Sequence, residues 1–157
     1  MPGDQHLFQV AIIVKYKFNG LPLGKSYRNK ILRMSLRSEI KDRQDVNLLV
    51  VSFYAKIRKH QTLGPIFNGI IQDWDSHLEL LTDFWESQLL LKRKYIGNPI
   101  AVHQEVDEKM NHGITSEHFG LWLNEWFATI DELFEGEVAW IAKNRAQKMS
   151  TMLYMNI

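Results

Sequence analysis

Two histidines have the setting that a metal-binding imidazole needs. His103 ends the heptapeptide GNPIAVH, in which Asn98 suits the N-cap of a helix and Pro99 suits its first position. His77 begins a stripe of apolar side chains with helical spacing. Because neutral imidazole is a common metal ligand, the pair points to a metal or metal-containing cofactor. A single histidine is more often a surface or core residue, so the surrounding elements must support this interpretation.

The composition limits what could hold a metal. The chain has 157 residues, of which 45% are hydrophobic and 24% charged, as in one soluble globular domain. It contains no cysteine, which excludes disulfides, thiolate-bound zinc or iron–sulfur clusters, thiol catalysis and cofactors attached through thioether bonds. Any metal must therefore be held by histidine, by carboxylates or within a non-covalent cofactor.

No segment has the length of a membrane span. The longest apolar runs, such as VAIIV at 10–14, fall far short of the roughly 20 residues that cross a bilayer. Lys15 and Lys17 follow this run where a secretory signal would have small residues before its cleavage site. We therefore expect a cytoplasmic protein that has no membrane partner.

The beginning of the chain differs from the rest. Residues 1–44 contain nine Lys and Arg against three Asp and Glu, a net charge of +6, whereas the remainder is acidic. Residues 1–33 combine β-branched and aromatic residues with Gly20, Pro22 and Gly24. They could form a short hairpin, a flexible basic arm, or upstream codons before a natural start at Met34, and we favour the last two. We place the folded domain in residues 34–157.

Helical periodicity dominates from Asp45 onward, so the predicted fold is all-α. A helix buried on most sides covers 45–60 and should end near Gly64–Pro65. A second covers 75–92, with Asp75 and Ser76 as possible caps. The turn of GNPIAVH is followed by a loop over 104–114. The final helices cover 116–134, after Thr115, and 137–155, after Gly136, and are expected to pack against each other.

Several segments, taken together in order, resemble one protein family. The chain is similar to the truncated haemoglobins, specifically group III, also called group P, and the similarity extends from Asp45 to near the end. The resemblance implies a globin-like two-over-two helical sandwich that holds haem b non-covalently. The matching segments are FYAKIRKH (53–60), LGPIF (63–67), WDSHLELLTDFW (74–85), YIGNPIAVH (95–103), HFGLWLNEWF (118–127) and RAQKMSTML (145–153).

The resemblance also assigns site residues. It implies that His103 is the proximal ligand of the haem iron. Tyr54, Trp122 and His77 would face the bound ligand on the distal side, although the two aromatic residues could also simply fill core. The remaining cofactor contacts would be Phe67 on the haem face, Phe53, Leu81, Phe84 and Trp85 in the pocket wall, and Arg93, Lys94 and Tyr95 as donors to the propionates.

The function that the resemblance implies is reversible binding of O₂, CO or NO at the iron. NO or peroxide turnover with electrons from a reductase is a possible extension, so we leave open whether the protein is an enzyme. In one alternative His77 becomes the sixth iron ligand, which suits electron transfer or redox sensing. In another the chain is a haem-free helical adaptor whose basic arm binds nucleic acid or an anionic surface, but retention of His103, Tyr54, Trp122 and Phe67 argues against it. We expect a monomer without a nucleic-acid partner.

The sequence also departs from the family in two places. The predicted loop after His103, which contains His112, is longer than the family pattern, and the basic N-terminal arm has no counterpart in the compact family core.

Overall fold

The computed structural model describes residues 37–157. The predicted extension at residues 1–33 lies outside this range, and its boundary with the folded domain stays a prediction. Residues Glu39–Ile157 form one compact unit. Its regular elements are the helices α3 (Arg43–Ile57), α4 (Leu63–Ile70), α5 (Trp74–Leu89), α6 (Pro99–Lys109), α7 (Ser116–Leu133) and α8 (Glu137–Tyr154).

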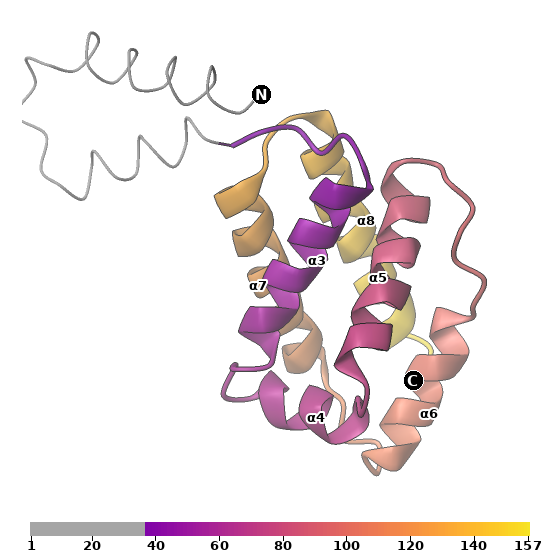
Figure 1. Ribbon diagram of the computed structural model, residues 1–157. Coiled ribbons are helices and arrows are strands. Elements are labelled where there is room, and N and C mark those ends of the chain that lie inside the picture. Colours follow the sequence, from indigo (N-terminus) through magenta and orange to yellow (C-terminus); the bar gives the residue numbers. More distant parts are fainter. Residues whose placement is uncertain (1–36) are drawn as a thin grey trace, which may run out of the picture. The chain divides into compact units, whose positions relative to one another are not determined.

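The helices form the two-over-two sandwich that the sequence resemblance implied (Figure 1). Helix α3 packs against α5, and α7 packs against α8, each pair running antiparallel. The layers meet because α3 also contacts α7 and α5 contacts α8. Short α4 contacts α3 and α7, and α6 contacts α8. None of the helices in the described part of the chain is long and apolar enough to span a membrane.

Aromatic side chains fill the core between the two layers. Phe53, Trp85 and Trp126 are almost fully buried. The Phe53 ring meets Trp126 edge-on, with ring centroids 5.0 Å apart, while Trp126 and Trp85 are stacked at 4.4 Å. Burying a large apolar side chain stabilises the folded state by roughly 1.5–3 kcal/mol, so these three residues stabilise the contact between α3, α5 and α7.

Side-chain caps fix where several of the helices begin. The Asn98 side chain accepts a hydrogen bond from the Ala101 amide at 3.3 Å, and Pro99 occupies the first turn, as predicted. Helix α7 begins after Thr115, also as predicted. The prediction for α5 was wrong, because Asp73 is its cap and accepts from the Ser76 amide at 3.1 Å.

Two further predictions were wrong. The first helix ends at Ile57, and Gly64–Pro65 lie in the first turn of α4. A proline is tolerated there because a backbone N–H in the first turn would have no partner within the helix. Gly64 is required there because a Cβ would lie 2.8 Å from the carbonyl oxygen of Arg58. The predicted loop over 104–114 is helical as far as Lys109, so only residues 110–115 connect α6 to α7.

Candidate functional site

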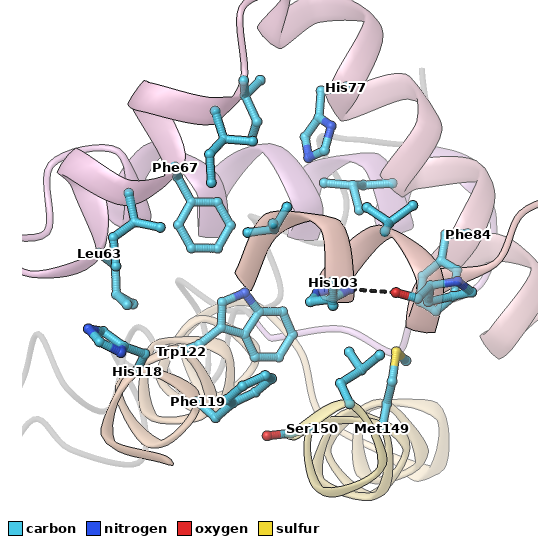
Figure 2. A pocket seen from close by; sticks show the side chains of 18 of the residues that line it. Leu63, Phe67, His77, Phe84, His103, His118, Phe119, Trp122, Met149 and Ser150 are labelled. Atoms are coloured by element: carbon cyan, nitrogen blue, oxygen red, sulfur yellow. Dashed lines mark hydrogen bonds between the residues drawn. The ribbon is translucent and has the colours of Figure 1, made fainter. Parts of the chain in front are cut away.

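A cavity of about 280 Å³ is lined by residues of all six helices and of the connections on either side of α6 (Figure 2). Its walls are mostly aliphatic and aromatic, and none of its lining residues is Asp, Glu, Lys or Arg. The predicted site residues that line it are Tyr54, Phe67, His77, Leu81, Phe84, Trp85, Tyr95, His103 and Trp122. Phe53 and Arg93 do not.

His103 enters the cavity from the second turn of α6. Its Nδ1 lies 2.7 Å from the carbonyl oxygen of Pro99 (dashed in Figure 2). A carbonyl can only accept, so Nδ1 carries the proton and Nε2 keeps its lone pair. Burial lowers the pKa of His103, although the bond to Pro99 opposes this effect. The ring is therefore a neutral imidazole whose free nitrogen can bind a metal.

Tyr54 supplies a buried hydroxyl from α3. Burial raises the pKa of its phenol well above the usual value, and a hydrogen bond from Trp122 opposes this only in part. The hydroxyl therefore stays protonated. Because the Trp122 N–H donates to the Tyr54 oxygen, the Tyr54 O–H remains free to donate into the cavity.

Phe53 lies behind these two side chains. Its ring packs edge-on against Tyr54 and Trp122, with centroids 4.8 and 4.9 Å away. The residue was predicted to wall the pocket, but it is fully buried in the core and orients the two aromatic residues that do line it.

His77 lies at the beginning of α5 on the same wall as Tyr54. The two rings meet edge-on at 6.2 Å, and Trp74 packs edge-on against the His77 ring at 5.9 Å. Burial lowers the pKa of His77, so a neutral imidazole is favoured. The structure thus brings His77, Tyr54 and Trp122 to one cavity with His103, each from a different helix. Figure 2 shows His77, His103 and Trp122 around this cavity.

The predicted propionate donors lie in the segment between α5 and α6, and only Tyr95 lines the cavity. Arg93 is exposed. The Lys94 ammonium lies 3.1 Å from Glu86, a buried carboxylate that also binds Arg43 at 2.7 Å. Burial would raise the pKa of Glu86, but hydrogen bonds from Arg43 and Lys94 hold it below its usual value. Lys94 therefore has a structural partner.

One hydroxyl holds the end of the same segment against α5. The Ser87 Oγ accepts hydrogen bonds from the backbone amides of Lys94 and Tyr95, both at 3.1 Å. The Tyr95 ring then meets Phe84 edge-on, with centroids 5.0 Å apart. This arrangement fixes the cavity wall immediately before α6.

Sequence reasoning missed His118, which also lines the cavity. Its Nδ1 accepts from the Thr115 amide at 3.0 Å and completes the cap of α7. The spacing offered a signal, because His118 lies one helical turn before Trp122 and therefore on the same face.

The site fits a planar metal cofactor better than a bare ion. No group of three or more His, Cys, Asp or Glu side chains that could hold a metal occurs within residues 37–157. A metal bound by the single imidazole of His103 would need its other ligands from a cofactor. A porphyrin supplies four nitrogen ligands and apolar faces, which match the uncharged cavity wall.

Comparisons with known proteins agree with this geometry. The chain matches no family model. It is 28% identical over 127 residues to the group 3 truncated hemoglobin ctb of Campylobacter jejuni, an alignment that covers 76% of this chain and 96% of that protein. The crystal structure of a group III truncated hemoglobin from Campylobacter jejuni superposes with a TM-score of 0.69 at 26% identity, covering 77% of this chain and 95% of the other. Together with the helical sandwich and its cavity, these likenesses show that the chain is similar in sequence and in fold to the group III truncated haemoglobins.

Proposed function

We propose that the cavity binds haem b non-covalently and that Nε2 of His103 would bind its iron. The observation that carries the proposal is the neutral imidazole of His103, whose Nδ1–H is held by Pro99 at 2.7 Å in a cavity without charged lining residues. A carbonyl partner of this kind fixes the ring orientation and increases the basicity of the ligating nitrogen. Bound haem would supply an iron that can bind O₂, CO or NO.

The role of Tyr54 is to donate a hydrogen bond to such a ligand. Bound O₂ carries partial negative charge, and a donor in a water-excluded cavity stabilises that charge without having to reorganise. Trp122 lines the same cavity and donates its single N–H to the Tyr54 oxygen, so it orients Tyr54 and would donate to the ligand itself only when that N–H is released. A hydrogen bond to a charged group contributes roughly 1.5–3 kcal/mol, which corresponds to about tenfold to more than a hundredfold slower release. This magnitude favours tight holding, or NO or peroxide chemistry supported by a reductase, over transport.

A second candidate function follows from His77. Its half-buried ring has a pKa lowered by burial and lies in the same cavity as His103. A neutral imidazole there can serve as a sixth iron ligand, which would suit a redox protein. The two functions differ in whether the ferrous iron has an open position before any gas is added.

The visible absorption spectrum of the purified, haem-loaded chain tests both. We expect a Soret band that shifts when CO is added after dithionite. A ferrous spectrum of the six-coordinate, low-spin type before CO would favour ligation by His77. A chain that folds as helix but takes up no haem would contradict the proposal.

Replacing His103 by glycine tests the axial ligand. The variant should lose the wild-type ferrous spectrum and regain it when imidazole is added, because free imidazole can occupy the vacated space. His112, an exposed histidine that binds Asp107 outside the cavity, is the matched control. His112→Gly should keep the wild-type spectrum, whereas an unchanged spectrum in His103→Gly would refute the ligand assignment.

A further inference from the structure

Three tryptophans form a continuous stack that reaches the cavity wall at both ends. The rings of Trp122 and Trp126 are nearly parallel, at 16° and with centroids 5.5 Å apart. Trp126 and Trp85 are stacked at 25° and 4.4 Å. Trp122 and Trp85 line the cavity, and fully buried Trp126 lies between them. We call these residues the tryptophan stack.

The chemistry of the stack differs from that of an ordinary aliphatic core. In a chain without cysteine, indole and phenol rings are the side chains that most easily lose one electron. A radical cation formed on one of two stacked indoles shares its charge with the neighbour, which favours oxidation there over oxidation of an isolated ring. The Trp126 N–H also donates to the Ala142 carbonyl at 3.3 Å, and that oxygen stabilises positive charge on the indole.

The other two tryptophans lack these properties. Trp74 lies near Tyr54, but the Arg58 guanidinium sits 4.6 Å from its ring centroid, and this positive charge disfavours a second one on the ring. Trp140 is 65% exposed, and no stacked neighbour is found for it within the described residues. The most oxidisable position is therefore the pair of Trp126 and Trp85, which Trp122 connects to the Tyr54 side of the cavity.

We propose that the tryptophan stack is a one-electron donor that removes oxidising equivalents from the cavity. This inference rests on the proposed binding of haem. When hydrogen peroxide is cleaved at the O–O bond to two water molecules, it takes up two electrons and two protons. Trp122 would supply one of these electrons, bound haem would supply the other and would itself be reduced again by an external one-electron donor such as ascorbate, and the protons would come from solvent. Transfer from Trp126 and Trp85 refills Trp122, leaving the radical cation on that pair until an external one-electron donor such as ascorbate reduces it.

The consequence would be protection of the site itself. Tyr54 hydrogen-bonds Trp122 at the cavity end of the stack. A stack that holds the radical cation competes with oxidation of this phenol and with bleaching of the haem. Removing the middle ring should therefore direct the damage to those groups.

The test is electron paramagnetic resonance of the ferric, haem-loaded protein frozen shortly after it is mixed with peroxide. Indole-deuterated tryptophan distinguishes indole from phenol radicals. The wild type should give a tryptophan radical. Trp126→Phe should lose it, with a shift to a tyrosine radical or faster loss of the Soret band. Trp140→Phe removes one exposed indole outside the stack and should retain the wild-type signal.

Two further measurements keep the proposal testable if Trp126→Phe does not fold. Trp85→Phe should weaken the radical signal, and mass spectrometry should find oxidation of wild-type protein at Trp126 or Trp85 ahead of exposed Trp140. The proposal would be overturned if mass spectrometry found Trp140 oxidised before Trp126 and Trp85, or if Trp126→Phe and Trp85→Phe gave the same radical signal as the wild type. The Soret band recorded before peroxide tests haem binding separately. In a chain without haem, a photochemically generated one-electron oxidant should still place the radical on the stack.

Discussion

Replacing Tyr54 by phenylalanine removes one hydroxyl from the cavity and little else. Tyr54 is 4% exposed, and its ring position is set by the edge contact with Phe53 at 4.8 Å, which phenylalanine can also make. The variant should therefore fold and bind haem as the wild type does. What it loses is the donor to bound O₂.

The magnitude follows from the geometry around Trp122. Loss of a hydrogen bond to a charged group costs roughly 1.5–3 kcal/mol, or about tenfold to more than a hundredfold in the dissociation rate. In the variant the Trp122 N–H no longer has the Tyr54 oxygen as acceptor, so it becomes available to the ligand. This compensation leads us to expect an increase near the lower end, on the order of tenfold. Tyr54→Phe combined with Trp122→Phe should reach the upper end.

Stopped-flow displacement of O₂ by CO measures the rate directly, with haem content determined on the same samples. Tyr154, which is 43% exposed and does not line the cavity, provides the control Tyr154→Phe, for which no change is expected. If haem-loaded Tyr54→Phe releases O₂ at the wild-type rate, the hydroxyl does not contact the ligand and the proposed role of Tyr54 is wrong.

Other predictions concern stability. Glu86→Gln should lower the free energy of unfolding at neutral pH by roughly 1–3 kcal/mol, because Arg43 and Lys94 both lose their bond to this buried carboxylate while Arg43 keeps Asp83 and Glu79, and urea titration measures this. Since the folded-state pKa of Glu86 is lowered, its contribution is present above the unfolded value of 4.5 and disappears as the pH falls through the folded value. The variant should therefore lose less stability on acidification than the wild type, and an equally steep loss would contradict this account. Gly64→Ala should destabilise the fold by about 1–3 kcal/mol because of the Arg58 carbonyl at 2.8 Å, whereas Gly69→Ala meets no atom and should be neutral or stabilising by up to about 1 kcal/mol in thermal denaturation.

Local sequence signals predicted several helix boundaries and failed at others for identifiable reasons. Asn98 and Thr115 are caps whose side chains act on residues within one turn, so their effect can be read from neighbouring letters. Gly64–Pro65 was predicted to end the first helix but lies at the beginning of α4, because a proline is tolerated in the first turn of a helix. The first helix ends earlier, at Ile57, where no glycine or proline marks the end in the sequence. The polar residues after His103 resemble a loop in composition, although Glu, Gln and Lys are also good helix formers.

The candidate site could be predicted only as far as helical periodicity and family resemblance extend. Residues such as His77, Leu81 and Phe84 share a face at helical spacing and do line one cavity. The connection between α5 and α6 has no helical periodicity, so the sequence could not predict which of its side chains face the cavity. Tyr95 lines the cavity and Arg93 does not. The distinction between a lining residue and one behind it, as for Tyr54 and Phe53, depends on neighbouring helices. The roles proposed for these residues remain predictions.

The single hydroxyl of Ser87 has a practical consequence for engineering the chain. Because its bonds to the amides of Lys94 and Tyr95 fix the segment close to α6, the residues just before that anchor need not keep their positions for the cavity to keep its shape. Leu91 is 83% exposed, and Arg93 is also exposed. Residues 91–93 are therefore a suitable place to insert a peptide tag or a spectroscopic label, since exposed tips tolerate insertions. The same insertion one residue after Tyr95 would fall between the anchor and His103, and it would displace the imidazole.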